Sequence, residues 1–316
     1  MNHSPERSNL EVFAETLLAL ARRDHDLLVV TSDSRGSGKL THFGRALPRQ
    51  IIETGIAEQN MVGVSAGMAA MGKKVFAVSP SSFLTARALE QIKNDVAYSN
   101  FPVKLVGISA GVAYGLYGFT HHANHDLAAL LAIPNVDIVV PFDNSETRWA
   151  VQATLNYSQP LYIRLGRKPM PDLRIPESSF AIGKANRLKE GRQACIIACG
   201  ETVLPALQAS DLLGNEGISC GVVSMHTLRP FDFTALAEIA RTVEAIVTCE
   251  EHSQYGGLGA ICASYLMENR LHLPFKSIAI PDQPIQSGSQ EQLYDFYGLS
   301  PHNIRDQVKA LLPSFA

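Results

Sequence analysis

The stretch that decides both the fold and the chemistry of this chain is Glu53-Thr-Gly-Ile-Ala-Glu-Gln-Asn60. It carries two carboxylates and leads into Met61–Met71, whose small and apolar residues predict a buried helix. Glu58 would lie in the first turn of that helix, beside free backbone N–H groups and at the favourable end of the helix dipole. The spacing alone leaves two interpretations open. Glu58 is either a functional carboxylate or an ordinary helix-start acid, with Asn60 or Thr54 as the cap.

Helices and strands are predicted to alternate along the first half of the chain. Ser8–Glu11 has the pattern of a capping box and opens an amphipathic segment that runs to Ala21. Apolar runs then predict strands at 26–33, 74–79, 103–109, 136–141 and 161–166, and helices at 83–98, 127–132 and 144–157. The inward-facing residues of the helix at 83–98 would be Leu84, Ala88, Ile92 and Val96. This alternation indicates a parallel sheet with helices on both faces.

The second half repeats this rhythm, and the fold class is therefore α/β with two doubly wound domains. Strands are predicted at 194–198, 219–224, 245–248 and 277–280, with helices at 204–213, 233–241 and 257–269. A length of 316 residues also suggests two domains. The segment 167–179 contains three prolines and few core residues. We place the linker at 171–184, between domains at 1–170 and 185–316.

Composition narrows the class of function. With 46% hydrophobic and 18% charged residues, the chain can bury a large core. The net charge is −3 and no basic patch stands out, so we expect no nucleic-acid partner. The five cysteines form no CxxC pair, which favours core residues in a reducing compartment. The polar start does not resemble a signal peptide, and no apolar run is long enough for a membrane span. We expect a cytoplasmic protein without a membrane partner.

The most unusual loop is 111–126, which holds three glycines, two tyrosines and three histidines. His121, His122 and His125 include an i,i+4 pair that could clip a metal on a helix. The glycines at the start of the loop argue against a helix there, and no cysteine lies nearby, so we expect no metal ligands in this chain. The loop instead suits a substrate site, because imidazoles transfer protons near neutral pH.

Several common site motifs are missing. No Gly-x-Ser-x-Gly elbow occurs, which excludes the usual serine hydrolase, and no Gly-x-Gly-x-x-Gly follows the first strand. The loop Ser34–Gly38 follows a strand end, where ligands bind in parallel sheets. It lacks the spacing of a phosphate-binding loop, and by itself a plain turn is favoured.

Taken in order, the motifs resemble the C-terminal half of a transketolase, an enzyme that depends on thiamine diphosphate, and in particular the C-terminal subunit of a split transketolase. They are Thr31-Ser-Asp33, Glu53-Thr-Gly-Ile-Ala-Glu58-Gln-Asn, Ser81-Ser-Phe83-Leu, Gly118-Phe-Thr-His121, Tyr162-Ile-Arg164-Leu-Gly, Leu228-Arg-Pro-Phe-Asp232 and Glu250-Glu-His with Gly-Gly-Leu-Gly259. The resemblance covers nearly the whole chain. It implies a pyrimidine-binding domain, followed by a transketolase C-terminal domain.

The resemblance also implies roles for individual residues. Glu58 would bind the pyrimidine nitrogen of thiamine diphosphate and favour the imino form that acts as the internal base. Phe83 would stack on the pyrimidine, and Asp33 and Ile56 would lie at the cofactor. His121 would face the substrate and transfer a proton. The enzyme would move a two-carbon ketol unit from a ketose to an aldehyde acceptor.

One motif of the family is absent, because the chain contains no Gly-Asp-Gly. In the family this motif binds Mg²⁺ and the diphosphate. The resemblance therefore implies a partner subunit that supplies the diphosphate-binding domain and the Mg²⁺ ligands, in an α₂β₂ assembly. The C-terminal domain would serve assembly. Its Glu250, Glu251 and His252 would form an interface or loop cluster rather than a metal site.

The positions that hold the acceptor phosphate in the family depart from its pattern. They fall at Leu10, Arg164, Ser109 and Ser37, so one arginine and one histidine are missing. Each lost charge-assisted contact is worth roughly 1.5–3 kcal/mol. We therefore expect an acceptor other than an ordinary pentose or tetrose phosphate.

Further residues of this sugar pocket also differ. An acid that reads sugar hydroxyls in the family falls at Tyr117. Tyr117, together with Tyr114, His122 and His125, predicts a sugar pocket that is less cationic than that of the family. Arg35 could bind an anion from another direction, which leaves a modified phosphate or a sulfonate sugar open.

Two alternatives remain at this stage. One is the β-subunit of a 2-oxo-acid dehydrogenase, which has similar length, domains and an equivalent glutamate. The motifs around Phe83 and His121 fit transketolase, or deoxyxylulose-phosphate synthase, better. The other is a non-catalytic assembly subunit, against which the joint presence of Glu58, Phe83 and His121 speaks.

Overall fold

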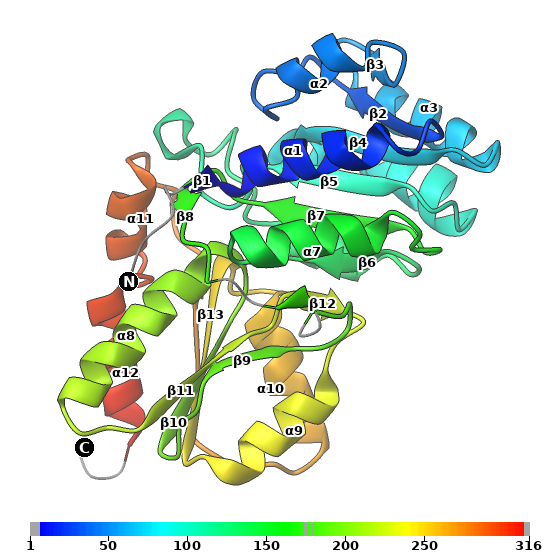
Figure 1. The fold of residues 1–316 in the computed structure, drawn as a ribbon. Coiled ribbons are helices and arrows are strands. Elements are labelled where there is room, and N and C mark those ends of the chain that lie inside the picture. Colours follow the sequence, from blue (N-terminus) through cyan, green and yellow to red (C-terminus); the bar gives the residue numbers. More distant parts are fainter. Residues whose placement is uncertain (1–6, 174–175, 178–179, 313–316) are drawn as a thin grey trace.

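The first domain is built on a parallel sheet that the apolar runs of the sequence predict. The computed structural model describes residues 7–173, 176–177 and 180–312. The sheet contains β2 (Leu27–Thr31), β3 (Ile51–Glu53), β4 (Lys74–Pro80), β5 (Lys104–Ile108), β6 (Asp137–Val139) and β7 (Leu161–Leu165). Their order is β6-β7-β5-β4-β2-β3, all parallel (Figure 1). The α/β fold class is confirmed.

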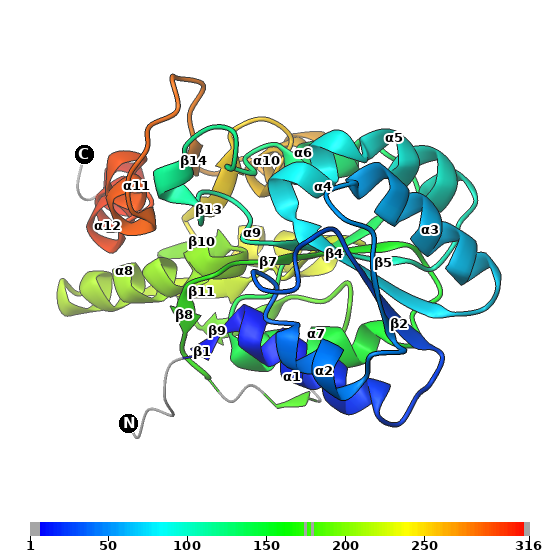
Figure 2. The same cartoon turned by 90° about the horizontal axis from the view of Figure 1, so that it is seen from above.

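Helices cover both faces of this sheet (Figure 2). One layer contains α1 (Asn9–Ala21), α2 (Thr41–Ala46) and α7 (Asn144–Thr154), which pack around Phe13, Phe43 and Val151. The other contains α3 (Glu58–Ala70), α4 (Ser81–Arg87), α5 (Leu89–Gln91), the π-helix η1 (Ile92–Tyr98) and α6 (Asp126–Leu131). The predicted capping box is present, since Ser8 and Glu11 exchange hydrogen bonds at the start of α1.

The single helix predicted at 83–98 is wrong. The structure breaks it at Ala88 and widens its last turns into η1. All four residues expected to face inward are fully buried: Leu84, Ala88, Ile92 and Val96. Residues spaced by four drift by about 40° per step on an ideal α-helix. The wider turn offsets this drift and keeps them against the sheet.

The second domain contributes a strand to the sheet of the first, which the sequence did not predict. β12 (Thr227–Arg229) pairs antiparallel with β6 and forms the edge of what becomes a seven-stranded sheet. Arg229 Nη1 donates hydrogen bonds to the carbonyls of Ile133 at 2.7 Å and Val136 at 3.2 Å. The two domains are therefore joined through the seven-stranded sheet, to which the second domain contributes one edge strand.

The second domain has its own five-stranded sheet, in the order β14-β13-β10-β11-β9. The strands are β9 (Asn186–Lys189), β10 (Ala194–Ala198), β11 (Cys220–Ser224), β13 (Ala245–Ser253) and β14 (Phe275–Ile280), and only β9 is antiparallel. The helices are α8 (Val203–Asn215), α9 (Phe233–Thr242), α10 (Leu258–Glu268), α11 (Gln290–Phe296) and α12 (Pro301–Leu311). In Figure 1, α8 and α12 lie on one face, with α9 and α10 on the other.

Two details differ from the sequence-based expectation. β13 was expected to end at 248 but runs to Ser253, so Glu250, Glu251 and His252 lie in a strand rather than a loop. Pro169–Met170 forms a short strand, β8, that pairs with β1 (Arg7–Ser8). The domain limits and the linker at 171–184 stay predictions, and 174–175 and 178–179 lie outside the described residues.

Two further features of the fold are the state of its cysteines and the length of its helices. All five cysteines are buried and unpaired. Within the described ranges, no helix has the length and apolar character needed to cross a bilayer.

Candidate active site

Glu58 is the buried carboxylate at the centre of the candidate site. It is the first residue of α3, and its side chain is only 3% exposed. No side chain caps this helix: the cap position is Ala57, and the Thr54 hydroxyl donates to the carbonyl of Thr31 instead. Both Glu58 carboxylate oxygens accept from Arg87 Nη1, each at 3.1 Å. Glu58 is thus a buried acceptor that needs a donor.

An aromatic row continues from this ion pair. The Arg87 guanidinium carbon lies 4.3 Å from the ring centroid of Phe83, and the His121 ring lies 5.1 Å from Phe83 at an angle of 70°. The Tyr117 ring stacks on His121 at 4.8 Å, and the Tyr114 ring contacts His121 at 5.7 Å. The structure therefore brings Phe83, His121 and Tyr117 together, and Arg87 joins them to Glu58, while their roles at a cofactor stay predictions.

An exposed cation ends this row. The Arg167 guanidinium lies 5.2 Å from the Tyr114 ring, in cation–π contact. Arg167 is exposed and lies two residues after the end of β7. Sequence reasoning assigned it to the proline-containing connection and missed it. The available signal was its position just beyond a parallel strand end, where ligands bind.

A second group forms at the carboxyl ends of β2 and β3, around Glu53. Its carboxylate accepts from the N–H groups of Asp33 at 2.6 Å and Gly55 at 3.0 Å, and from the Thr31 hydroxyl at 2.8 Å. Arg35 Nε lies 3.5 Å from the same carboxylate. Glu53, the other carboxylate of the 53–60 stretch, therefore holds this loop in place.

The predicted ligands of this loop are displayed at the surface. Asp33 adopts a left-handed backbone with φ 57° and is exposed, and Ile56 is 72% exposed. The exposed Ser37 donates its hydroxyl to the Ser34 carbonyl at 3.1 Å. Arg35 faces Glu53, so its availability to an anion depends on leaving that partner.

Arg164 lies inside the junction between the domains rather than at an open pocket. Its Nε donates to Asp126 at 2.8 Å, and its Nη2 donates to the carbonyls of Glu251 at 2.9 Å and Ala123 at 3.2 Å. The Tyr162 hydroxyl donates to the same Asp126 carboxylate at 2.8 Å. The role of Arg164 as a substrate ligand stays a prediction, and these contacts favour a structural role.

Electrostatics at this junction are strongly shifted. Burial is the largest influence on Asp126 and acts to raise its pKa, but the charges of Arg164 and His252 and the hydrogen bonds from Arg164 and Tyr162 together outweigh it, so the pKa lies below its usual range. Burial raises the pKa of Glu250 to about 7. Burial and the neighbouring Glu201 carboxylate raise the pKa of Glu251 to about 8.

Hydrogen bonds explain why these acids are tolerated. Glu250 accepts from the first N–H groups of α10, those of Leu258 at 2.7 Å and Gly259 at 2.8 Å. Glu251 accepts from the Val112 N–H at 2.9 Å and the Gln290 amide at 3.0 Å. The cluster belongs to the interface between the two domains.

Of the remaining predicted residues, His122 and Ser109 are buried and His125 is exposed. His122 is buried, its Nε2 lies 3.3 Å from the Gly115 carbonyl, and burial lowers its pKa. His125 is exposed, with Nε2 3.4 Å from the Thr85 hydroxyl. Ser109 is buried and its hydroxyl has no hydrogen-bond partner. No contact joins Ser109 or His122 to Glu58 among the described residues, so their substrate roles stay predictions. In the part of the chain that the structure describes, no group of three or more His, Cys, Asp or Glu side chains is placed to hold a metal ion.

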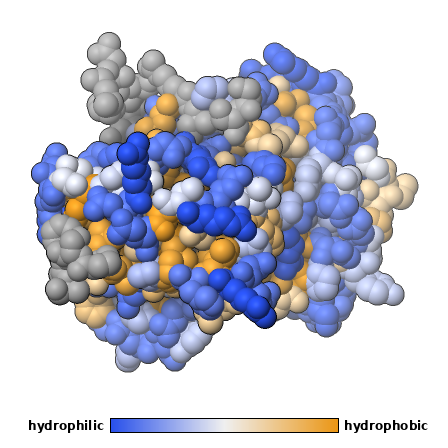
Figure 3. All heavy atoms as spheres, turned by 90° about the horizontal axis from the view of Figure 1, so that it is seen from below, coloured by the Kyte–Doolittle hydropathy of each residue, from blue (hydrophilic) through white to orange (hydrophobic). Residues whose placement is uncertain are grey.

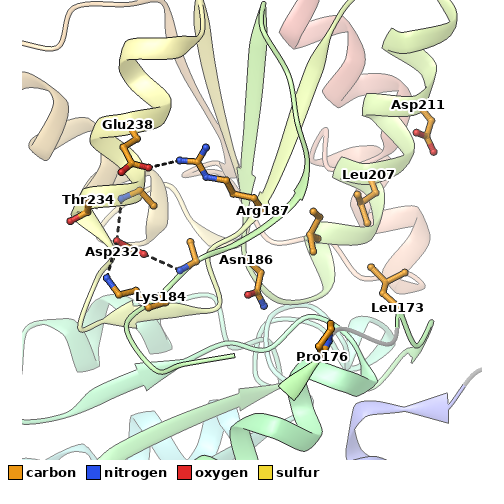
Figure 4. Close-up of a pocket in the computed structure, with 13 residues that line it drawn as sticks. Leu173, Pro176, Lys184, Asn186, Arg187, Leu207, Asp211, Asp232, Thr234 and Glu238 are labelled. Atoms are coloured by element: carbon orange, nitrogen blue, oxygen red, sulfur yellow. Dashed lines mark hydrogen bonds and ion pairs between the residues drawn. The ribbon is translucent and has the colours of Figure 1, made fainter. Parts of the chain in front are cut away.

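A wide hollow lies away from this row. It has a volume of about 970 Å³ and is bordered by β9, α8, α9 and the region of Leu173 (Figure 4). The charges that line it are paired, with Arg187 bound to Glu238 at 2.7 Å and Lys184 3.9 Å from Asp232. Seen from below, the molecule shows apolar side chains scattered among hydrophilic ones (Figure 3). We do not assign chemistry to this hollow, because its charges are already satisfied.

Comparisons with known proteins agree with this geometry. The family described as "Transketolase, pyrimidine binding domain" matches residues 6–171, and "Transketolase, C-terminal domain" matches residues 183–304. The chain belongs to the transketolase family. The relatives described next are named as transketolases, which favours that function over the dehydrogenase and assembly-subunit alternatives.

Two relatives of this transketolase chain are named as subunits. It is 45% identical over 293 residues to a subunit of the apulose-4-phosphate transketolase of Phocaeicola vulgatus, covering 92% of this chain and 93% of that one. It is 34% identical over 294 residues to a subunit of the 6-deoxy-6-sulfo-D-fructose transketolase of a Clostridium species, covering 93% and 91%. A solved structure titled "Split gene transketolase, inactive beta4 tetramer" matches with a TM-score of 0.87 at 34% identity, covering 98% of this chain and all of that one.

The side chains of this transketolase chain fit the pyrimidine of thiamine diphosphate. Glu58 offers a buried acceptor, and Phe83 offers a half-buried ring face beside it. A single planar group, the Arg87 guanidinium, already contacts both. A flat heterocycle with an N–H donor could therefore be held in the same way.

Proposed function

We propose that this chain is the pyrimidine-binding subunit of a split transketolase, which transfers a two-carbon ketol unit between a ketose and an aldehyde. The observation that carries the proposal is the series of side-chain contacts from Glu58 through Phe83 to His121. It occurs in a chain that belongs to the transketolase family. When bound, thiamine diphosphate supplies the nucleophilic carbon that accepts the two-carbon unit. Glu58 would accept a hydrogen bond from its pyrimidine ring, and Phe83 would stack on that ring.

His121 holds the proton that the sugar exchanges. Its Nδ1 lies 2.9 Å from the Thr120 hydroxyl, so Nε2 is the atom directed to a substrate hydroxyl. Tyr117 stacks on the imidazole and fixes its plane. This arrangement suits general acid–base catalysis at a hydroxyl or carbonyl of the sugar.

The diphosphate and Mg²⁺ would be bound by a partner subunit. The absence of Gly-Asp-Gly from the sequence supports this division, as do relatives that are named as subunits. We propose an α₂β₂ assembly, in which each composite site lies between two chains. The buried, unpaired cysteines support a cytoplasmic location.

We propose a sugar with an anionic end as the substrate. Arg167 supports this, because its exposed guanidinium ends the row that starts at Glu58. The two relatives are named for apulose 4-phosphate and 6-deoxy-6-sulfo-D-fructose, a phosphate and a sulfonate sugar. A phosphate or sulfonate held by Arg167 would place the reactive end of the sugar toward His121.

The test is ketol transfer by the complex with its partner subunit. We expect Glu58→Gln to lower kcat by at least about 100-fold, because the variant lacks the carboxylate that would bind the pyrimidine. Glu244→Gln, an exposed acid of the second domain, is the control and should leave kcat unchanged.

The substrate panel would be ribose 5-phosphate, apulose 4-phosphate and sulfofructose. Full activity of Glu58→Gln would refute the proposed mechanism. Use of ribose 5-phosphate as efficiently as by ordinary transketolases would refute the expected preference for an unusual anionic sugar.

A further inference from the structure

Arg87 lies between Glu58 and Phe83 in the candidate site, and the proposed transfer mechanism gives this cation no role. It is the last residue of α4, and its side chain is 49% exposed. Its Nη1 lies 3.1 Å from each oxygen of Glu58, and its guanidinium carbon lies 4.3 Å from the Phe83 ring centroid. One flat group therefore joins the buried carboxylate to the aromatic face.

These two contacts are the ones assigned to the aminopyrimidine in the proposed function. A ring that stacks on Phe83 and donates to Glu58 at hydrogen-bond distance would overlap the guanidinium. The His121 ring also contacts Phe83, with its centroid 5.1 Å away. Arg87 and the pyrimidine cannot both occupy this position.

We propose that Arg87 is a placeholder, which occupies the pyrimidine position in the cofactor-free subunit and is displaced when thiamine diphosphate binds. This inference rests on the proposed function, because it assumes that Glu58 and Phe83 receive the pyrimidine. Arg87 then sets the affinity for the cofactor by competing with it.

Glu58 and Arg87 differ in how much each loses without its partner, as a placeholder requires. Glu58 is 3% exposed, and a buried carboxylate without a donor is costly. Arg87 is half-exposed, so its guanidinium regains water when it leaves. The guanidinium therefore stabilises the empty half-site and can be exchanged for another planar donor.

The experiment is calorimetric titration of the assembled complex with thiamine diphosphate and Mg²⁺. We expect Arg87→Met to bind the cofactor about tenfold more tightly, because Met cannot compete for Glu58. Arg87→Lys should bind about threefold more tightly, since its ammonium reaches Glu58 without the flat group that covers Phe83. Arg187→Met is the matched control: Arg187 is similarly exposed and paired with Glu238 at 2.7 Å, but lies in the other domain. Its affinity should equal that of the wild type.

The outcomes separate this inference from the proposed function. Saturable binding by the wild type with equal or weaker binding by Arg87→Met would overturn the placeholder. Absence of binding by the wild type and both Arg87 variants would overturn the proposed function and the placeholder together. Binding by a variant but not by the wild type would support the placeholder.

Two further measurements guard against an unstable variant. Thermal unfolding and size-exclusion chromatography report whether Arg87→Met folds and assembles, and Arg87→Lys decides the question if it does not. A crystal structure of the loaded complex gives a direct answer. The placeholder requires Arg87 to lie beyond hydrogen-bond distance of Glu58 in that structure.

Discussion

Glu251 links the stability of the domain junction to pH. Its pKa lies near 8 in the folded chain, through burial and the nearby Glu201, against an ordinary value of 4.5. Between these values the folded chain retains a proton that the unfolded chain releases, so the free energy of unfolding falls as the pH rises from about 4.5 to 8. We expect Glu251→Gln to raise the Tm at pH 8.5 by roughly 2–4 °C for each kcal/mol recovered. The gain should vanish near pH 5.

Scanning calorimetry from pH 5 to 8.5 measures this difference. Glu291→Gln is the control, because Glu291 is an exposed acid of α11 and should show no comparable trend. A variant that is less stable than the wild type at pH 8.5 would show that Glu251 is needed in its charged form.

At the residue scale, the motifs singled out three residues of the candidate site but not the cations around them. Glu58, Phe83 and His121 lie in short motifs whose spacing is characteristic, and the structure brings them together. Arg164 matched a motif too, yet Asp126 draws it into the domain junction. Arg87 and Arg167 lack a distinctive spacing, and only the fold shows that their guanidinium groups reach Phe83 and Tyr114.

Among the elements, β5 depends on a glycine near its carboxyl end. A Cβ on Gly107 would clash with the hydroxyl of Tyr162, which donates to Asp126 at 2.8 Å. We expect Gly107→Ala to lower the free energy of unfolding by about 2–4 kcal/mol, because the buried network must shift. Urea denaturation measures the change.

A second glycine provides the opposite case. Gly214 lies in α8, and a Cβ there would meet open space. Gly214→Ala should stabilise the chain by about 0.5–1 kcal/mol, because alanine favours a helix. Equal effects of the two substitutions would contradict the role assigned to Gly107.

Core elements were predictable where apolar runs were long. The predicted strand 194–198 coincides with β10, and α9 lies within one residue of its prediction. Short elements such as β12 were not, because three residues carry too little pattern and their pairing is decided by contacts distant in sequence. The break at Ala88 likewise depends on how the helix meets the sheet.

For the whole molecule, Arg229 fastens the second domain to the first. Its guanidinium donates to carbonyls at the end of α6 and in the following loop, including those of Ile133 and Val136. We expect Arg229→Met to lower the free energy of unfolding by about 1–3 kcal/mol, because buried carbonyls lose their donors. Limited proteolysis should then cut the predicted linker at 171–184 faster.

The matched control is Arg241→Met. Arg241 is exposed, and it donates within its own helix α9, to the carbonyl of Ala237 at 3.4 Å. Unchanged proteolysis of Arg229→Met would mean that the other contacts of the junction hold the domains together without this side chain.

The shared sheet has a consequence for synthesis on the ribosome. β6 ends at Val139 and its partner β12 ends at Arg229, about 90 residues later. At about 5–20 residues per second, the edge of β6 stays open for roughly 5–20 s while the rest of the first domain can already fold. β6 is only three residues long and starts with Asp137, and short, charged edges resist pairing with other chains. The nascent protein is thereby protected from aggregation during the interval in which its sheet is incomplete.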